Sequence, residues 1–181
     1  MNTGQTMLTI LALTLLSIIT MRYYSTIGYT GRNLSQTNAA FIATTVATSM
    51  MEQIDNCAYD QYTDTATTSI DSSRFTSPGS LGKESGESMA DWRHYNDIDD
   101  FNSDTIKFTP GWMNEEYSVA ISVYYVSCWG DINIKVTSKP TYVKRIDLTV
   151  WRSYPPLDTT EGKVAKITVS NLHGYYFFNP I

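Results

Sequence analysis

The chain begins with a long run of side chains that are almost all apolar or neutral. Its first 51 residues carry only two charges, Arg22 and Arg32. The apolar core of this run, residues 7–21, is shorter than the ~20 residues that a helix needs to cross a bilayer, but the neutral residues on both sides bring it into range. We therefore expect a helix that lies in a membrane or at the centre of a helical bundle. The side chains expected to lie in the membrane or in the core of the bundle are Met7, Leu8, Ile10, Leu11, Leu13, Leu15, Leu16, Ile18 and Ile19.

The polar residues of this segment suit a lipid environment. Arg22, Tyr23 and Tyr24 are typical of an interfacial anchor, where aromatic rings and a long cationic side chain lie at headgroup depth. Hydroxyl groups within the segment can bond to carbonyl groups one helical turn earlier. A cleavable secretory signal is the alternative, but the segment has neither a basic start nor a small-residue cleavage site. We expect the segment to be retained.

A second periodic pattern follows the apolar run. Apolar residues recur at three- and four-residue steps, the spacing of one buried helix face, at Ala39, Ile42 or Ala43, Val46, Met50 and Ile54. Gly28 and Gly31 lie between the two patterns, and each costs about 1 kcal/mol relative to alanine within a helix. Two interpretations follow: a loop between two helices, or one helix of about 50 residues that is roughly 75–80 Å long.

The remainder of the chain divides into a polar region and a strand-rich region. Residues 57–115 are rich in Ser, Thr, Asp and Gly and predict a variable connecting region. From residue 116 the period becomes two, which is typical of half-buried strands. Strands are expected at residues 117–125, 132–136, 146–151 and 165–169, with a short edge at 175–178.

These patterns predict an α+β fold with three parts. The first is a long N-terminal helix, residues 1–56, with an apolar half at 5–30 and an amphipathic half at 33–56. The connecting region follows, and residues 116–181 form an antiparallel sheet. One face of that sheet needs a cover, and the apolar stripe of the amphipathic half is the expected cover.

Charge and motif content exclude several function classes. The net charge of −5 arises in the C-terminal part, which argues against nucleic-acid binding through a basic face. His94 and His173 are the only histidines, and no nucleophile elbow, phosphate-cradling glycine pattern or dinucleotide fingerprint is present. We expect a protein that is not an enzyme and that needs no organic cofactor.

One acidic cluster is a candidate calcium site. Oxygen ligands at high density suit Ca²⁺, and the candidates within eight positions are Asp97, Asp99, Asp100, Asn102 and Asp104. The start of the pattern matches an EF-hand loop, but Thr105 replaces the glycine and Gly111 replaces the bidentate glutamate. It is therefore not an EF-hand. Two interpretations remain: a loop held by structural calcium, or carboxylates that cap turns.

Two cysteines, Cys57 and Cys128, are too few and too far apart for a zinc site. In an exported protein they are expected to form one disulfide, which would join the end of the helix to the first predicted strand and contribute about 2–4 kcal/mol. Two separate buried thiols are the alternative.

The order of these parts resembles the type IV pilin and pseudopilin superfamily. Gly4, directly before Gln5 and the apolar run, is similar to the prepilin cleavage point, and residues 95–102 (YNDIDDFN) resemble an acidic and aromatic segment of prepilin-like proteins. The resemblance implies a subunit that lies in the inner or cytoplasmic membrane before assembly and is processed between Gly4 and Gln5. Pilus assembly machinery would then add it to an extracellular filament on the cell surface.

Two features depart from the pilin pattern. The residues before Gly4 carry no positive charge. The glutamate that is usual at the fifth mature position is also replaced, by Thr9 after cleavage or by Gln5 without it. The buried charge pair that this glutamate forms with a neighbouring subunit would therefore be missing, and with it a source of register specificity.

The expected function is that of a structural subunit of a type IV pilus-like filament, a homo-oligomer that polymerises through its apolar helix. Two alternatives remain. One is a pseudopilin or minor tip pilin of a secretion or pilus system, and the other is a monomeric membrane-anchored domain that binds a ligand.

Overall fold

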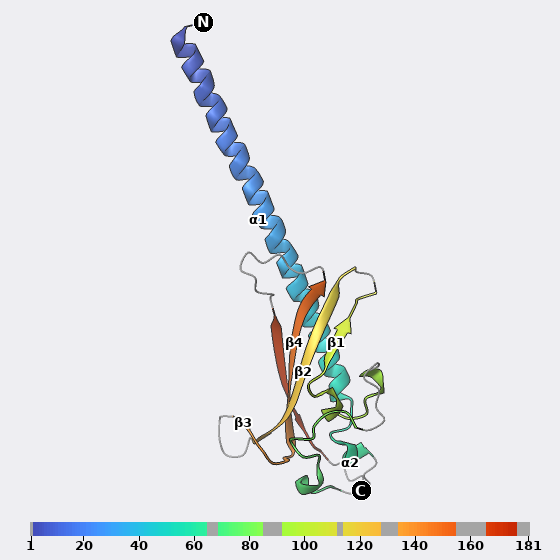
Figure 1. The fold of residues 1–181 in the computed structure, drawn as a ribbon. Helices are drawn as coiled ribbons and strands as arrows, with labels where there is room; N and C mark the ends of the chain where they lie inside the picture. Colours follow the sequence, from blue (N-terminus) through green and yellow to red (C-terminus); the bar gives the residue numbers. More distant parts are fainter. Residues whose placement is uncertain are drawn as a thin grey trace. The chain divides into compact units, whose positions relative to one another are not determined.

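The computed structural model describes residues 2–64, 69–84, 92–111, 114–127, 134–154 and 166–176, with Asp64 described by its backbone alone. The chain forms two compact units, Met1–Ala39 and Ala40–Ile181. Helix α1 (Thr3–Asp55) makes up most of the first unit and continues into the second (Figure 1).

Helix α1 is a single element of 53 residues. Gly28 and Gly31 lie inside it, so the interpretation as two helices joined by a loop is wrong and the single long helix is confirmed. The sequence allows this continuity because no proline precedes Pro78, and proline is the residue that most strongly breaks a helix. The helix ends where the Asn56 side chain donates a hydrogen bond to the carbonyl oxygen of Glu52 at 2.8 Å.

The second unit contains a five-stranded antiparallel sheet. Its main strands lie in the order β1-β2-β4-β5, and the short β3 pairs with the end of β2. The strands are β1 (Thr105–Phe108), β2 (Glu116–Ser127), β3 (Lys135–Val136), β4 (Val143–Tyr154) and β5 (Ile167–Gly174).

Strand β4 buries alternate residues, and β2 does so from Val119 to Tyr125, as the period of two predicts. In their register Ile121 lies opposite Leu148, and both side chains are almost completely buried. The same hydrophobic core contains one face of α1, formed by Ala43, Val46, Ala47, Met50, Met51 and Ile54. This is the face that the helical spacing predicted. The α+β fold, a long N-terminal helix packed on an antiparallel sheet, is therefore confirmed.

The predicted strands agree with the observed ones in the centre of the sheet and differ from them at its edges. Strand β1 lies within residues 57–115, which the sequence assigned to a connecting region; only Ile106 of its four residues is buried, so the strand produces no periodic signal. At the predicted edge 175–178, residues 175–176 lie outside any strand and the next two are not among the described residues. The predicted strand 132–136 is described only from residue 134.

Short helical turns fill the rest of the connecting region. These are α2 (Gln61–Asp64), η1 (Ser72–Arg74), η2 (Trp92–His94) and η3 (Asp99–Phe101). All three residues of η3 are buried, and Phe101 joins the main core. The connecting region is therefore partly an interior part of the second unit.

Candidate functional site

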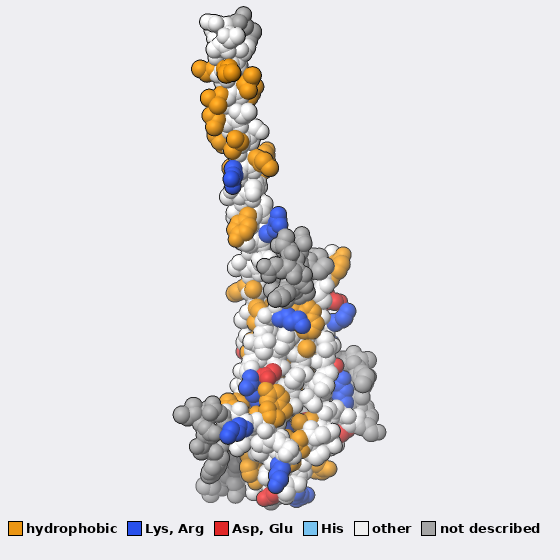
Figure 2. All heavy atoms as spheres, turned by 60° about the vertical axis from the view of Figure 1, so that its left-hand side comes forward, with side chains coloured by type: hydrophobic (Ala, Val, Ile, Leu, Met, Phe, Trp, Pro, Cys, Tyr) orange, Lys and Arg blue, Asp and Glu red, His pale blue; other side chains and the backbone are white. Residues whose placement is uncertain are grey.

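The N-terminal part of α1 presents its apolar side chains to the surface. All nine residues predicted to form a filament or membrane core are more than half exposed, from 52% for Leu15 to 76% for Met7. Figure 2 shows the orange apolar side chains gathered along this part of the helix. Monomeric soluble proteins rarely expose a large contiguous apolar patch, and such patches mark interaction or membrane surfaces.

Threonine hydroxyl groups in this part of the helix donate hydrogen bonds to carbonyl oxygens of the same helix. The hydroxyl groups of Thr9, Thr14 and Thr20 donate to carbonyl oxygens three or four residues earlier, at 2.8–3.0 Å. Ser17 makes no such bond in the described helix. Because the hydroxyl groups of these three threonines are satisfied within the helix, they do not oppose its transfer to an apolar environment.

The predicted interfacial anchor and processing point lie on the same helix. Tyr23 and Tyr24 are 65% and 72% exposed, with their rings in an edge-to-face arrangement 6.1 Å apart. Gly4 and Gln5 lie in the first turn of α1. Cleavage between them stays a prediction. The helix is long and apolar enough to cross a membrane, and no residue of its most apolar 18-residue window is buried.

A second candidate site is a group of buried carboxylates next to η3. The side chain of Asp97 accepts hydrogen bonds at Oδ1 from the backbone N–H groups of Asp99 (2.9 Å) and Asp100 (3.2 Å). The Asp100 carboxylate in turn accepts bonds from the N–H groups of Asn96 and Asp97. These reciprocal bonds are the capping role that the sequence suggested for the acidic cluster, and they fix the backbone of this turn.

Lys144 of β4 reaches the same group from the sheet. Its ammonium group lies 2.8 Å from Asp99 Oδ1 and 3.5 Å from Asp60 Oδ2, and it also donates to the carbonyl oxygen of Tyr59. The side chains of Lys144, Asp60 and Asp99 are all fully buried. A lysine is almost never buried to this degree without paired charges, so the pairing explains its position.

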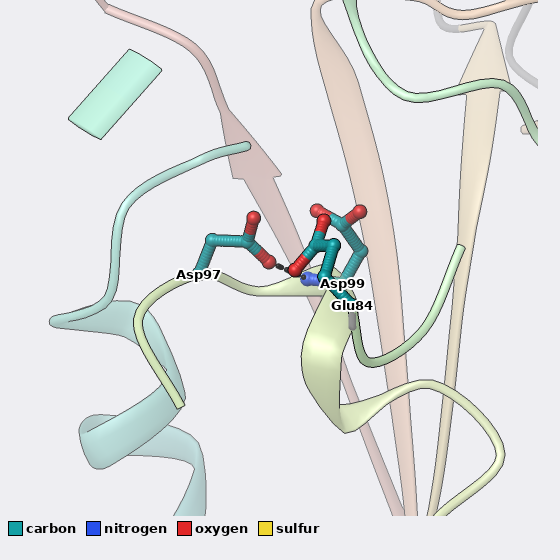
Figure 3. A group of neighbouring side chains, drawn as sticks. All are labelled: Glu84, Asp97 and Asp99. Carbon is teal, nitrogen blue, oxygen red and sulfur yellow. Dashed lines mark hydrogen bonds between the residues drawn. The ribbon is translucent and has the colours of Figure 1, made fainter. Parts of the chain in front are cut away.

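The structure divides the predicted calcium ligands into two groups. Asp97 and Asp99 lie together with Glu84, which the sequence did not single out (Figure 3). Asn102 is held by the carbonyl oxygen of Leu81 and the N–H group of Val123.

The last predicted ligand, Asp104, has other partners. It forms an ion pair with Lys83 at 3.0 Å and accepts a hydrogen bond from the Tyr95 hydroxyl at 2.8 Å. Burial opposes ionisation of Asp104, but the hydrogen bonds from Tyr95 and Lys83 outweigh it and lower the pKa of this carboxyl group. Asp104 is therefore a paired surface carboxylate.

Electrostatics distinguish Asp97 from ordinary capping carboxylates. Burial raises the pKa of Asp97 to about 9, together with the negative charge of Asp99, a side-chain hydrogen bond shared with Asp99, and the negative charge of Asp100. Lys144 acts in the opposite direction without cancelling these effects. A group of this kind requires either a bound proton or a nearby cation at neutral pH.

The sequence contained an indication that Lys144 takes part in the buried carboxylate group. In β4 the buried positions alternate along the strand, and Lys144 and Arg152 are the charged residues at the two ends of the apolar series Ile146, Leu148 and Val150. A charged residue at an inward-facing position predicts a buried partner of opposite charge. Glu84 and Asp60 had no comparable signal, because they belong to irregular segments.

The cysteine and histidine predictions are only partly covered by the described residues. Cys57 is half-buried and donates a hydrogen bond to the carbonyl oxygen of Gln53 at 3.4 Å; burial, with the nearby acidic charges, raises the pKa of its thiol. Cys128 lies outside the described residues, so the disulfide stays a prediction. His173 lies 3.2 Å from Asp55 in an open groove of about 770 Å³.

Comparison of this chain with models of protein families, with curated proteins and with solved structures found no match. The resemblance to pilins therefore rests on the order of its parts and on the residues that carry it.

Proposed function

We propose that this protein is a structural subunit of a type IV pilus-like filament outside the cell, and that it polymerises through the N-terminal part of α1. The observation that carries this proposal is the exposure of nine apolar side chains on residues 7–19 of that helix. No charged side chain lies among them, since the first charge along the chain is Arg22. Such a surface is stable only in lipid or against other apolar surfaces.

The energetics favour assembly of identical subunits. Burial of apolar surface recovers about 25 cal/mol per Å², and a bundle of copies of this helix provides that burial after the subunit leaves the membrane. A heterologous contact that repeats without closing into a ring produces a helical fibre. In the absence of a carboxylate at position 5 or 9, these contacts are apolar and involve no buried charge pair.

The proposal includes a route to the filament. Before assembly the N-terminal part of α1 spans the inner or cytoplasmic membrane, with Tyr23 and Tyr24 near the headgroups. Assembly machinery then transfers the subunit to the fibre on the cell surface. The role is mechanical, without a catalytic or nucleic-acid-binding activity.

The test is self-assembly of the purified full-length protein after detergent removal. We expect filaments by negative-stain electron microscopy and a pelletable fraction on centrifugation. Leu13→Asp should abolish both, because it places a charge on the apolar surface, whereas Leu13→Met should retain them because it conserves volume and polarity. A monomer that stays soluble in plain buffer contradicts the proposal.

The same experiment separates the two alternatives. A monomer that binds vesicles but never assembles supports the membrane-anchored ligand-binding domain. Assembly only when other cell-envelope subunits are added supports a pseudopilin or tip pilin.

A further inference from the structure

Two buried carboxylate oxygens next to η3 have no hydrogen-bond donor among the residues that the structure describes. Asp97 Oδ2 and Asp99 Oδ2 are inaccessible to solvent, and neither accepts a hydrogen bond from any of the described residues. Both residues are 0% exposed. A buried carboxylate oxygen without a hydrogen-bond donor is strongly unfavourable, so these positions favour a bound proton or a cation.

The two aspartates and Glu84 have the spacing of calcium ligands. Each offers one carboxylate oxygen, and these oxygens lie within 4.8 Å of one another. Oxygens bound to one Ca²⁺ ion at its usual distance are separated by at most about 5 Å, so these three oxygens can share one ion. Figure 3 shows the three side chains converging from two segments of the chain.

The surroundings already hold the aspartates in position. Asp97 Oδ1 is fixed by two backbone N–H groups, and Asp99 Oδ1 is fixed by the Lys144 ammonium group at 2.8 Å. In each aspartate one oxygen is therefore used for orientation while the other remains available. Metal sites commonly have ligands that are oriented in this way by a second layer of hydrogen bonds.

We propose that Glu84, Asp97 and Asp99 bind one Ca²⁺ ion, with water and carbonyl oxygens completing its coordination. The ion would fasten the segment that contains Glu84 to the turn at η3, and so stabilise the connecting region against the sheet. This ligand set differs from the one expected from the sequence, because Asn102 and Asp104 have other partners and Glu84 takes part.

Thermal unfolding of the full-length protein in detergent tests the site. The protein is first treated with a chelator, and then melted with CaCl₂, with MgCl₂ or without a divalent cation. At a calcium concentration of about 100 times the Kd we expect the melting temperature to rise by about 5–10 °C. Magnesium at the same concentration should produce a much smaller rise. Equal melting temperatures with and without calcium, up to 10 mM, would overturn the proposal.

Three variants locate the ion. Asp97→Asn and Glu84→Gln should each remove most of the calcium-dependent rise. Asp97→Asn should also melt at or above the wild-type temperature in metal-free buffer, because a buried amide needs no counter-charge and its Oδ1 still accepts the two backbone hydrogen bonds. Asp104→Asn is the matched control and should keep the full rise.

The pattern among the variants decides between ligand sets. Loss of the rise in Asp104→Asn, with retention in Glu84→Gln, would overturn the proposed ligands in favour of those expected from the sequence. If Asp97→Asn does not fold, Glu84→Gln alone gives the answer, because Glu84 is only half-buried and its substitution leaves the η3 turn intact. In detergent the measurement is independent of filament formation.

Discussion

The N-terminal part of α1 and the interior of the second unit depart from the usual distribution of side chains in opposite ways. The helix exposes leucine and isoleucine residues, such as Leu15 and Ile18, at more than half of their surface. The second unit fully buries Asp97, Asp99 and Lys144. An exposed apolar surface and a buried charge are each unfavourable alone, so each indicates a missing or necessary partner.

The two departures call for different partners. The apolar surface is extended and lacks specific polar groups, which suits lipid or copies of the same helix. The buried charges are localised and directional, which suits a counterion with defined geometry. Four predictions test this difference between the helix surface and the buried charges.

The largest effect is expected from placing the same charge in the two halves of α1. Ala47 is 0% exposed and packs in the core, whereas Ala12 is exposed. We expect Ala47→Glu to lower the free energy of unfolding of the second unit by roughly 4 kcal/mol or more, because it buries an unpaired charge in a close-packed site. Ala12→Glu should change that stability by less than about 0.5 kcal/mol while abolishing assembly.

Urea unfolding followed by tryptophan fluorescence, together with centrifugation, measures both properties of this pair. Equal stability losses in the two variants would show that the two halves of the helix do not differ in burial. Tolerance of Ala47→Glu would mean that the amphipathic half does not pack on the sheet.

The next largest effect concerns the buried ammonium group. Lys144→Met leaves Asp99 and Asp60 without their cation, and we expect a loss of about 3–5 kcal/mol in urea unfolding. Lys107→Met is the matched control, because the Lys107 side chain is 69% exposed in its pair with Glu116. The control should lose less than about 1 kcal/mol. Similar losses in both variants would contradict the special role of the buried pair.

A smaller effect is expected on the outer face of the sheet. Burial opposes ionisation of Asp147, but hydrogen bonds from Ser170, Tyr124 and Arg145 outweigh it and lower the pKa of this carboxyl group. The folded pKa is thus below the unfolded value of about 4, so this stabilisation is complete above that pH and is lost as the pH falls below it.

For Asp147→Asn we therefore expect a loss of about 1 kcal/mol at pH 7 and a smaller loss at about pH 2.5. Urea unfolding of wild type and variant at the two pH values measures this difference. A loss that is the same at both pH values would show that the ionised carboxylate is not the stabilising form.

The smallest effect concerns the glycines of α1. A Cβ atom added at Gly28 or Gly31 would meet no atom within 4 Å. Each glycine-to-alanine substitution should stabilise the helix locally by about 0.5–1 kcal/mol, and amide hydrogen exchange in residues 24–35 should slow by a factor of about five. Faster or unchanged exchange would contradict a regular helix at this point. Loss of filaments without any change in exchange would instead assign the glycines to close contacts between subunits.

Much of the fold was predictable from periodic patterns. The three- and four-residue spacing that includes Val46, Met50 and Ile54 located the buried face of α1, and the period of two located β2 and β4. These patterns are reliable because regular elements repeat their geometry, and a repeated geometry leaves a repeated sequence. Strand β1 left no such pattern, since only Ile106 of its residues is buried.

The candidate sites were predictable to different degrees. The apolar surface of residues 7–19 follows directly from composition, because its chemistry does not depend on which atoms meet. The acidic cluster was predicted from residues 97–104. The structure brings Asp97 and Asp99 together with Glu84, whereas Asp104 pairs with Lys83 and Tyr95; metal binding stays a prediction.

The sequence by itself determined where this protein is apolar, where it is helical or extended, and which segment holds its acidic residues. Only the tertiary structure decided that Lys144 and the half-buried Glu84 join the buried Asp97 and Asp99 in one group. The physical reason is that hydrophobicity and backbone period are local properties that a sequence records directly. Ion pairs and metal ligands depend on distances between segments far apart in the chain, which only packing of the core sets.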